Sequence, residues 1–365
     1  MTTVAAPLDI VILGLSITSS WGNGHATTYR GLVSALAERG HRVLFLERDV
    51  PWYADHRDLP RPTYCRTELY GSVTELEERF ASAVRDADVV IMGSYVPDGI
   101  EIGRWVTDVA NGVTAFYDID TPVTLARLAD GGTTYITREL IARYDLYLSF
   151  TGGPTLERLE RELGSPCARP LYCSADVASY FPESLVPRWD LGYMGTYSHD
   201  RQPTLDRLLL EPARRWPDGR FVVAGPQYPP HIQWPANVER IEHLAPSEHR
   251  AFYSSQRFTL NVTRADMIAA GYSPSIRLFE AAASGVPIIS DWWEGLDELF
   301  EPGSEILIAR EPDDVLRALR DRTEHDRRAI GERARQRVLS AHTAAHRAVE
   351  LERHVRAAAR RGATI

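Results

Sequence analysis

Short runs of nearly uninterrupted apolar residues recur along this chain, and most of them are followed by a stretch with helical periodicity. The run at 9–15 precedes a helical pattern at 24–39, and a second apolar run follows at 42–46. Strands that are apolar on both faces are typical of parallel sheets covered by helices on each side. The alternation therefore predicts βαβ units in an α/β fold with doubly wound, Rossmann-like sheets.

The alternation stops between residues 174 and 190 and then starts again. This segment carries Pro182 and Pro187 and shows no periodicity, and an almost wholly helical region follows at 313–361. A length of 365 residues suits two domains. We therefore predict two Rossmann-like domains facing a cleft and a final helix, with the boundaries 1–183, 188–342 and 343–365.

Charge and composition exclude several classes of protein. Hydrophobic residues make up 44% of the chain, enough for full cores, and the formal net charge of -9 argues against a nucleic-acid binder. Three cysteines without paired spacing and scattered histidines predict no metal site and indicate a reducing compartment. The first residues lack a basic region, and no apolar run approaches the ~20 residues of a membrane span. We expect a soluble cytoplasmic protein without a transmembrane segment.

The first candidate motif, Trp-Gly-Asn-Gly-His at 21–25, joins the first predicted strand to the first helix. Ligands bind outside the carboxyl ends of strands in such sheets. Gly22, Asn23 and Gly24 let another molecule approach the backbone, and we expect them to contact an acceptor. His25, at the helix start, is a candidate proton acceptor. The alternative is that the glycines only form the turn and His25 packs.

A second motif places two carboxylates, Asp118 and Asp120, after the apolar strand at 113–117. Strand alternation predicts that both side chains point the same way, and two like charges at this range raise at least one pKa. Both are therefore candidate catalytic residues, with Asp120 the stronger. The alternative is that Asp120 caps the helix that begins near Pro122.

A third motif lies in the restarted alternation, where Gly195 follows a strand and Arg201 opens the next helix. Backbone amides of the Gly195 loop can cradle a phosphate, and Arg201 can neutralise it. The alternative is a tight turn beside a solvated arginine.

The fourth motif, at 271–290, is the most informative. Ser273 is a candidate N-cap, and the amides of the helix start, with Ser275, can hold a pyrophosphate. Arg277 and Glu280 fall on one polar stripe of an otherwise apolar helix. We expect Arg277 to reach a phosphate and Glu280 to accept hydrogen bonds from a ribose diol. An internal pair between these two side chains is the alternative.

At this motif the sequence resembles a known family. RLFEAAASGVPIIS, at 277–290, looks like the C-terminal signature of group 1 (family 4-like) glycosyltransferases of the GT-B fold, and DWWEGLDELFEPGSEILI after it is closest to the spore-maturation-protein-like branch. The resemblance covers most of 190–345. It is looser over 9–150, where it depends on GNGHATTYRGLVSALAERGHRV.

The resemblance implies a nucleotide-sugar donor in the C-terminal domain and a final helix that crosses back to the N-terminal domain. Glu280 matches the ribose-binding glutamate, Gly195 and Thr196 match the phosphate-side loop, and Arg201 lies where a basic donor contact occurs. His243 ends the stretch that matches the base-binding segment. Such enzymes need no metal or other cofactor, and we expect UDP or dTDP as the nucleotide.

Two positions depart from the family pattern. Tyr272 stands where many members have a second glutamate, and Gln202 and Pro203 follow Arg201 where a lysine is usual. The stereochemistry of transfer and the identity of the donor sugar therefore stay open.

We predict a metal-independent hexosyltransferase that moves a sugar from a nucleotide-diphosphate donor to an acceptor hydroxyl, the acceptor being a small molecule or a glycan. The alternatives are a nucleotide-sugar epimerase on the same fold and a non-catalytic structural protein. Trp21, Trp52 and Tyr53, within or near the proline-rich segment 49–63, either line an apolar acceptor pocket or pack the loop.

Overall fold

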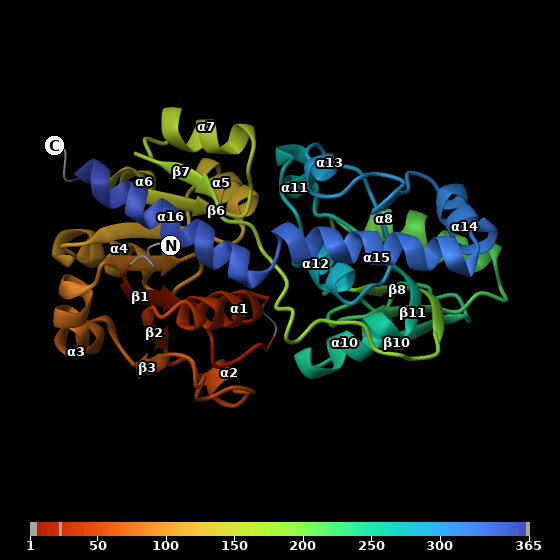
Figure 1. Ribbon diagram of the computed structural model, residues 1–365, viewed down its shortest axis with the longest axis horizontal. Coiled ribbons are helices and arrows are strands. Elements are labelled where there is room, and N and C mark those ends of the chain that lie inside the picture. Colours follow the sequence, from red (N-terminus) through yellow and green to blue (C-terminus); the bar gives the residue numbers. More distant parts are fainter. Residues whose placement is uncertain (1–5, 22–23, 363–365) are drawn as a thin grey trace, which may run out of the picture. The chain divides into compact units, whose positions relative to one another are not determined.

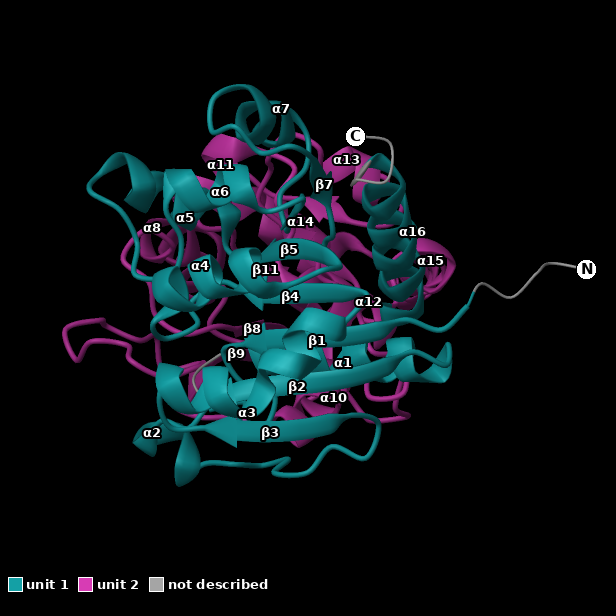
Figure 2. Cartoon of the chain, turned by 90° about the vertical axis from the view of Figure 1, so that its left-hand side faces the viewer, with its two compact units in different colours: residues 1–172, 344–365 teal, residues 173–343 magenta. Residues whose placement is uncertain are grey.

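The computed structural model describes residues 6–21 and 24–362, and the chain divides into two compact units. Unit 1 contains residues 1–172 and 344–365, and unit 2 contains residues 173–343 (Figure 2). The proline-bearing segment 174–190 therefore belongs to unit 2. Its Tyr180 is buried and its ring lies 6.4 Å from that of Tyr253, also in unit 2.

Unit 1 is built on a seven-stranded sheet in which neighbouring strands are parallel, in the order β3-β2-β1-β4-β5-β6-β7. Figure 1 labels β1, β2, β3, β6 and β7 of this sheet. Its strands are β1 (Asp9–Gly14), β2 (Arg42–Arg48), β3 (Arg66–Tyr70), β4 (Val89–Gly93), β5 (Val113–Asp118), β6 (Leu146–Ser149) and β7 (Ala168–Pro170). Its helices are α1 (His25–Glu38), α2 (Pro51–Ala54), α3 (Val73–Asp86), α4 (Gly99–Val109), α5 (Thr121–Ala129), α6 (Arg138–Arg143), α7 (Pro154–Arg161) and α16 (Ala344–Gly362).

Unit 2 repeats this architecture with a six-stranded parallel sheet in the order β10-β9-β8-β11-β12-β13. Its strands are β8 (Trp189–Met194), β9 (Phe221–Ala224), β10 (Val238–Ile241), β11 (Gln256–Asn261), β12 (Ile288–Ser290) and β13 (Leu307–Ile308). Its helical segments are α8 (Gln202–Leu205), the π-helical η1 (Asp206–Leu210), α9 (Glu211–Arg215), α10 (Pro246–Ser254), α11 (Ala265–Ala270), α12 (Ile276–Ala283), α13 (Leu296–Leu299), α14 (Pro312–Asp321) and α15 (Glu324–Ala341).

The central strands owe their formation to burial on both faces. All six residues of β5 and all five of β4 are buried, and β8 is buried over its first five residues. Such strands must be covered by helices on both sides, which accounts for the βαβ connections. The predicted pair of doubly wound sheets is therefore confirmed.

The final helix α16 belongs to unit 1, as the predicted return of the chain requires. It packs against α1 and buries apolar side chains such as Leu351 and Val355. Polar contacts reinforce the packing, because Glu352 accepts hydrogen bonds from Arg39 and lies 3.4 Å from Nε2 of His41. Within the described residues, no helix is long and apolar enough to cross a membrane.

Candidate functional site

Each sheet has one point where the strand order reverses, between β1 and β4 in unit 1 and between β8 and β11 in unit 2. Ligands of open α/β sheets bind outside the carboxyl ends of the strands at this point. In unit 1, His25 and Tyr95 follow β1 and β4 at this point, and Asp120 follows the neighbouring β5. In unit 2, the segments around Gly195 and Arg277 follow β8 and β11.

His25 is the first residue of α1 and is buried. Its ring lies edge-on to Tyr95, with 5.4 Å between the ring centroids, and its Nδ1 has no hydrogen-bond partner among the described residues. Burial lowers the pKa of His25, and the nearby Asp120 carboxylate acts in the opposite direction. A neutral imidazole with an open nitrogen is suited to accept a proton.

Asp120 precedes α5 at the N-cap position, but its side chain does not cap that helix. Its carboxylate instead accepts a hydrogen bond from the Tyr95 hydroxyl at 3.2 Å. The interpretation of Asp120 as a helix cap is therefore wrong, and the structure brings His25, Tyr95 and Asp120 together at one edge of the sheet.

Asp118 differs from Asp120, although strand alternation predicts the same orientation for both. β5 ends at Asp118 and the chain turns, so Asp118 is completely buried and accepts hydrogen bonds from Tyr147, Thr124 and the amide of Asp120 at 2.5, 2.9 and 3.1 Å. Burial raises the pKa of Asp118 to about 6, and the charge of Asp120 acts in the same direction. Its placement makes Asp118 a positioning residue for the turn that holds Asp120, in contrast to its expected catalytic role.

Tyr95 is a site residue that the sequence analysis missed. It follows β4 with a φ of 64°, a left-handed conformation that few non-glycine residues adopt. Strained residues of this kind occur where the surrounding structure enforces them, often at functional sites. The conformation directs the Tyr95 ring toward His25 and its hydroxyl toward Asp120. No periodicity or motif in the sequence marks a tyrosine in this role.

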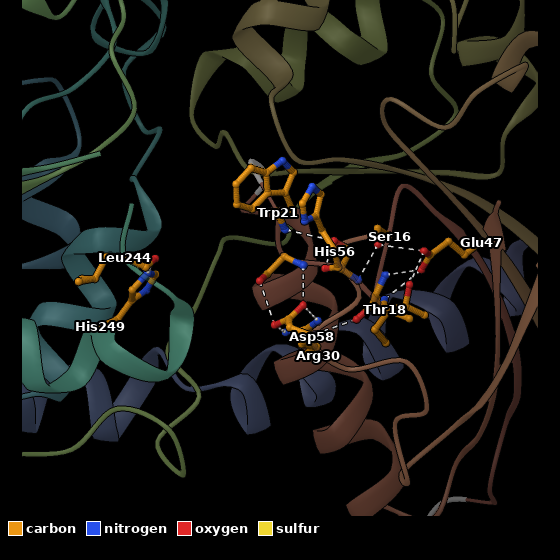
Figure 3. Close-up of polar contacts among 12 residues, drawn as sticks. Ser16, Thr18, Trp21, Arg30, Glu47, His56, Asp58, Leu244 and His249 are labelled. Carbon is orange, nitrogen blue, oxygen red and sulfur yellow. Dashed lines mark hydrogen bonds and ion pairs between the residues drawn. The ribbon is translucent and has the colours of Figure 1, made fainter. Parts of the chain in front are cut away.

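The loop after β1 is held by a buried carboxylate. Glu47, at the end of β2, is completely buried and accepts four hydrogen bonds, from the Ser16 and Thr18 hydroxyls at 3.0 and 2.6 Å and from the amides of Ile17 and Thr18 at 2.7 and 3.0 Å (Figure 3). Four bonds use the accepting capacity of a carboxylate fully. This loop leads to Gly24, which precedes α1 and is exposed. Gly22 and Asn23, predicted as acceptor contacts, lie outside the described residues.

The sequence leaves two interpretations open for Trp21, Trp52 and Tyr53, and the structure gives these residues different surroundings. Trp21 stacks on His56, with 4.2 Å between the rings, and so packs the loop (Figure 3). Trp52 and Tyr53 line a cavity of about 490 Å³ at the carboxyl ends of β1, β2 and β4. Tyr95 lines the same cavity, so the cavity borders the His25 and Asp120 group.

In unit 2, the side chain of Arg277 reaches from the start of α12 to the end of β8. Its Nε donates to the carbonyl of Met194 at 2.6 Å, its Nη1 donates to the Asn261 side chain at 3.0 Å, and its guanidinium lies 4.8 Å from the centre of the Tyr193 ring. A Cβ at Gly195 would lie 2.9 Å from Nη2 of Arg277, so glycine permits this close approach. These partners are neutral, which leaves the charge of a buried cation available to an anion.

The start of α12 differs from the prediction in its first residues. The helix begins at Ile276 with Ser275 at the N-cap position, and the Ser275 hydroxyl donates to Oδ1 of Asn261 at 2.7 Å. Ser273 is buried before the helix, so its expected role as N-cap is wrong. The Ser275 side chain makes no cap bond to the helix amides, while its carbonyl accepts from the amide of Leu278 at 3.1 Å. The amides of Ile276 and Arg277 are therefore the ones left for a ligand.

Glu280 lies one turn further along α12 and is only 4% exposed. Its Oε2 accepts from the Tyr253 hydroxyl at 3.2 Å, and Tyr180 also interacts with it. Arg277 and Glu280 therefore have different partners, and the internal pair weighed as an alternative does not form. A carboxylate has about four acceptor positions, so two tyrosines leave room for further donors.

The remaining donor candidates lie at other strand ends. Arg201 donates to the carbonyl of Thr196 at 2.7 Å, while its Nε is buried without a hydrogen-bond partner in the described part of the chain. His243 is exposed in the loop after β10. Gly225 approaches the Gly195 carbonyl so closely that a Cβ would lie 2.1 Å from its oxygen. The Gly195 loop, Arg201 and Arg277 thus occur at one edge of the sheet of unit 2.

Part of this chain matches a known protein family, and nearly the whole chain is similar to solved structures. Residues 201–353 match the model of a family described as glycosyl transferase-like, and a search of curated proteins finds no match. Similar solved structures include a sucrose-phosphate synthase from Thermosynechococcus elongatus, with 16% identity, a TM-score of 0.68, and coverage of 95% of this chain and 98% of that one.

Two further structures are similar over nearly the whole chain. HepE from Anabaena, in complex with UDP and glucose, has 10% identity and a TM-score of 0.67, with coverage of 96% of this chain and all of its own. An alpha-glucosyltransferase in complex with UDP-glucose and DNA containing an abasic site has 14% identity and a TM-score of 0.70, with the same coverage. At identities this low, the structural similarity shows the fold alone, and it confirms the predicted GT-B architecture.

Proposed function

We propose, on the premise that this chain is a glycosyltransferase of the GT-B fold, that it transfers a hexose from a UDP-sugar to an acceptor hydroxyl. The similar structures that hold UDP or UDP-glucose support the choice of nucleotide. We assign the donor to unit 2 and the acceptor to unit 1, each at the carboxyl ends of its strands.

One observation carries this proposal: the buried guanidinium of Arg277 has neutral partners beside the Gly195 loop. The Asp291 carboxylate also acts on Arg277 through space, and burial raises the pKa of Asp291. We propose that Arg277, the open Nε of Arg201 and the amides at the start of α12 bind the donor diphosphate in place of a metal ion.

These groups also favour departure of the diphosphate. Transfer breaks the bond between the anomeric carbon and a diphosphate oxygen, and negative charge grows on that oxygen. Fixed cations and amides aimed at the growing charge stabilise the transition state more than the ground state. We assign the proton of the acceptor hydroxyl to the imidazole of His25, with the Asp120 carboxylate stabilising the imidazolium that forms.

Thermal shift with UDP, dTDP, GDP and CMP tests the donor assignment, with Glu280→Gln beside the wild type. We expect UDP to raise the melting temperature most and Glu280→Gln to reduce that increase, because a neutral amide binds a ribose diol less strongly than a carboxylate does. Glu298→Gln, at an exposed position of unit 2, is the matched control. Failure of all four nucleotides to bind would overturn the proposal.

A further inference from the structure

Unit 1 contains a mainly apolar cavity next to the proposed reacting group. The cavity of about 490 Å³ is lined by Leu15 from the end of β1, by Val50, Trp52 and Tyr53 from the end of β2 and from α2, and by Tyr95 and Pro97 from the loop after β4. Its size falls within the range of pockets for small organic ligands. All of its lining residues belong to unit 1.

The walls of this cavity suit a flat ring system. The side chains of Trp52, Tyr53 and Tyr95 present three aromatic surfaces, and aromatic rings pack well by stacking or edge-on contact. Trp52 is 69% exposed, so its ring is available for contact with a ligand.

The same walls disfavour a carbohydrate acceptor. The polar atoms of the lining side chains are the Tyr53 and Tyr95 hydroxyls and the Trp52 indole nitrogen, and the Tyr95 hydroxyl already donates to Asp120. The many hydroxyls of a glycan would lose water here and find few partners, and each unmatched polar group costs about 1–3 kcal/mol.

Tyr95 connects the cavity to the reacting group. Its ring forms part of the cavity wall, its centroid lies 5.4 Å from that of His25, and its hydroxyl lies 3.2 Å from Asp120. Tyr95 is therefore the side chain that links a ligand in this cavity to the proposed proton acceptor.

From these contacts we propose that the acceptor is a flat aromatic compound with a phenolic hydroxyl, bound with its ring system in this cavity. The proposal rests on the proposed function for the transfer step and adds the chemical class of the acceptor. The phenol oxygen bonds to the anomeric carbon as the bond from that carbon to the diphosphate breaks, and the phenol proton passes to His25.

Binding measured without nucleotide tests the cavity separately from transfer. Umbelliferone, octanol and methyl glucoside serve as the flat phenol, the aliphatic alcohol and the sugar. We expect umbelliferone to bind most tightly and Trp52→Ala to weaken it about tenfold, as the loss of an aromatic contact together with its buried area predicts. Trp292→Ala, at an exposed tryptophan of unit 2, is the matched control and should change nothing.

A second variant keeps the test independent of Trp52. Val50→Trp should fill the cavity and abolish umbelliferone binding while UDP still raises the melting temperature. With UDP-glucose present, Trp52→Ala should raise the KM for umbelliferone and leave kcat nearly unchanged, because Trp52 contacts the ring and not the reacting oxygen.

The outcomes separate the two proposals. Tight umbelliferone binding that Trp52→Ala and Val50→Trp weaken supports the acceptor class, even if no nucleotide binds and the proposed function fails. If UDP binds and umbelliferone does not, or if octanol or methyl glucoside binds more tightly, the acceptor class is overturned and the donor assignment stands. Equal umbelliferone binding by the wild type and both variants also overturns it.

Discussion

Units 1 and 2 place functional groups at the same edge of similar parallel sheets, but the chemistry at these edges differs. The loops of unit 1 gather an imidazole, two carboxylates and aromatic rings around Asp120. The loops of unit 2 gather guanidinium groups, amides and hydroxyls around Arg277. The fold therefore supplies the position of a site, while the side chains after each strand decide what binds there.

The contrast extends to how each buried charge is stabilised. In unit 1, Glu47 and Asp118 receive several hydrogen bonds each from their own domain, so they hold loops in place. In unit 2, the hydrogen-bond partners of Arg277 are neutral, which leaves its charge available to a ligand. A buried charged group whose hydrogen-bonding capacity is filled by its own domain indicates a positioning role. A buried charged group whose charge is not matched indicates a role in ligand binding.

The largest expected effect concerns the reacting group of unit 1. His25→Ala should lower kcat about 10²–10⁴-fold, the range for loss of a general base. UDP affinity should not change, because the donor is assigned to unit 2. His56→Ala, an exposed histidine stacked on Trp21, is the control. An unchanged kcat in His25→Ala would move the proton acceptor elsewhere.

A change at the site of unit 2 should weaken donor binding, whereas the change in unit 1 lowers kcat. Arg277→Gln should weaken UDP binding about 10–100-fold, since a hydrogen bond to a charged group contributes about 1.5–3 kcal/mol. Uridine lacks the diphosphate and should bind the variant and the wild type equally, as isothermal titration can show. Arg207→Gln, at an exposed arginine, should leave both affinities unchanged. Equal losses for UDP and uridine would mean that Arg277 acts on the fold rather than on phosphate.

The pH dependence of stability should distinguish the positioning carboxylate Asp118. Its native pKa of about 6 lies above its unfolded value near 3.8, so the native state binds the proton more tightly. Its contribution to stability is therefore present below about pH 4 and is lost as the pH rises to about 6.

Chemical unfolding of Asp118→Asn beside the wild type measures this contribution. The stability of the wild type relative to the variant should fall by on the order of 2 kcal/mol between pH 4 and pH 6. A difference that is constant over this range would show that Asp118 is ionised at both pH values in the native state.

The smallest expected effect concerns α16, which packs against α1, β5 and β6 of unit 1. Glu352→Gln should weaken its contact with Arg39 and lower the stability of unit 1 by about 0.5–1 kcal/mol, as measured for partly exposed ion pairs. Hydrogen exchange should show faster opening in α1 and α16 and no change in unit 2. Glu332→Gln, exposed on α15, is the control. Faster exchange throughout unit 2 would show that the two units unfold together.

Much of the fold follows from the sequence because buried parallel strands leave a strong signal. The runs at β1, β4 and β8 are apolar, and the helices between them are long. β3 has no such signal, since Arg66 and Glu68 lie in this partly exposed edge strand. In unit 1, local pattern alone therefore finds the centre of the sheet and misses the edge strand β3.

The candidate site could be predicted only where a motif precedes or follows a strand. His25, Asp120 and Arg277 were found in this way, but Tyr95 and Asn261 were not, because each acts through contacts with residues far away in the sequence. Ser273 and Asp118 show a second reason why a role predicted from sequence can be wrong. Their expected roles depended on where a helix starts and where a strand ends, and a shift of one or two residues changes which side chain is exposed.

The position of α16 has a consequence for synthesis of the chain on the ribosome. Residues 173–343 of unit 2 emerge before residues 344–362, so unit 2 can fold while unit 1 still lacks its last helix. During this interval the apolar surface of α1 that later packs against α16 is uncovered. Chaperones that recognise exposed apolar segments would then meet a nascent chain with a finished second unit and an unfinished first one.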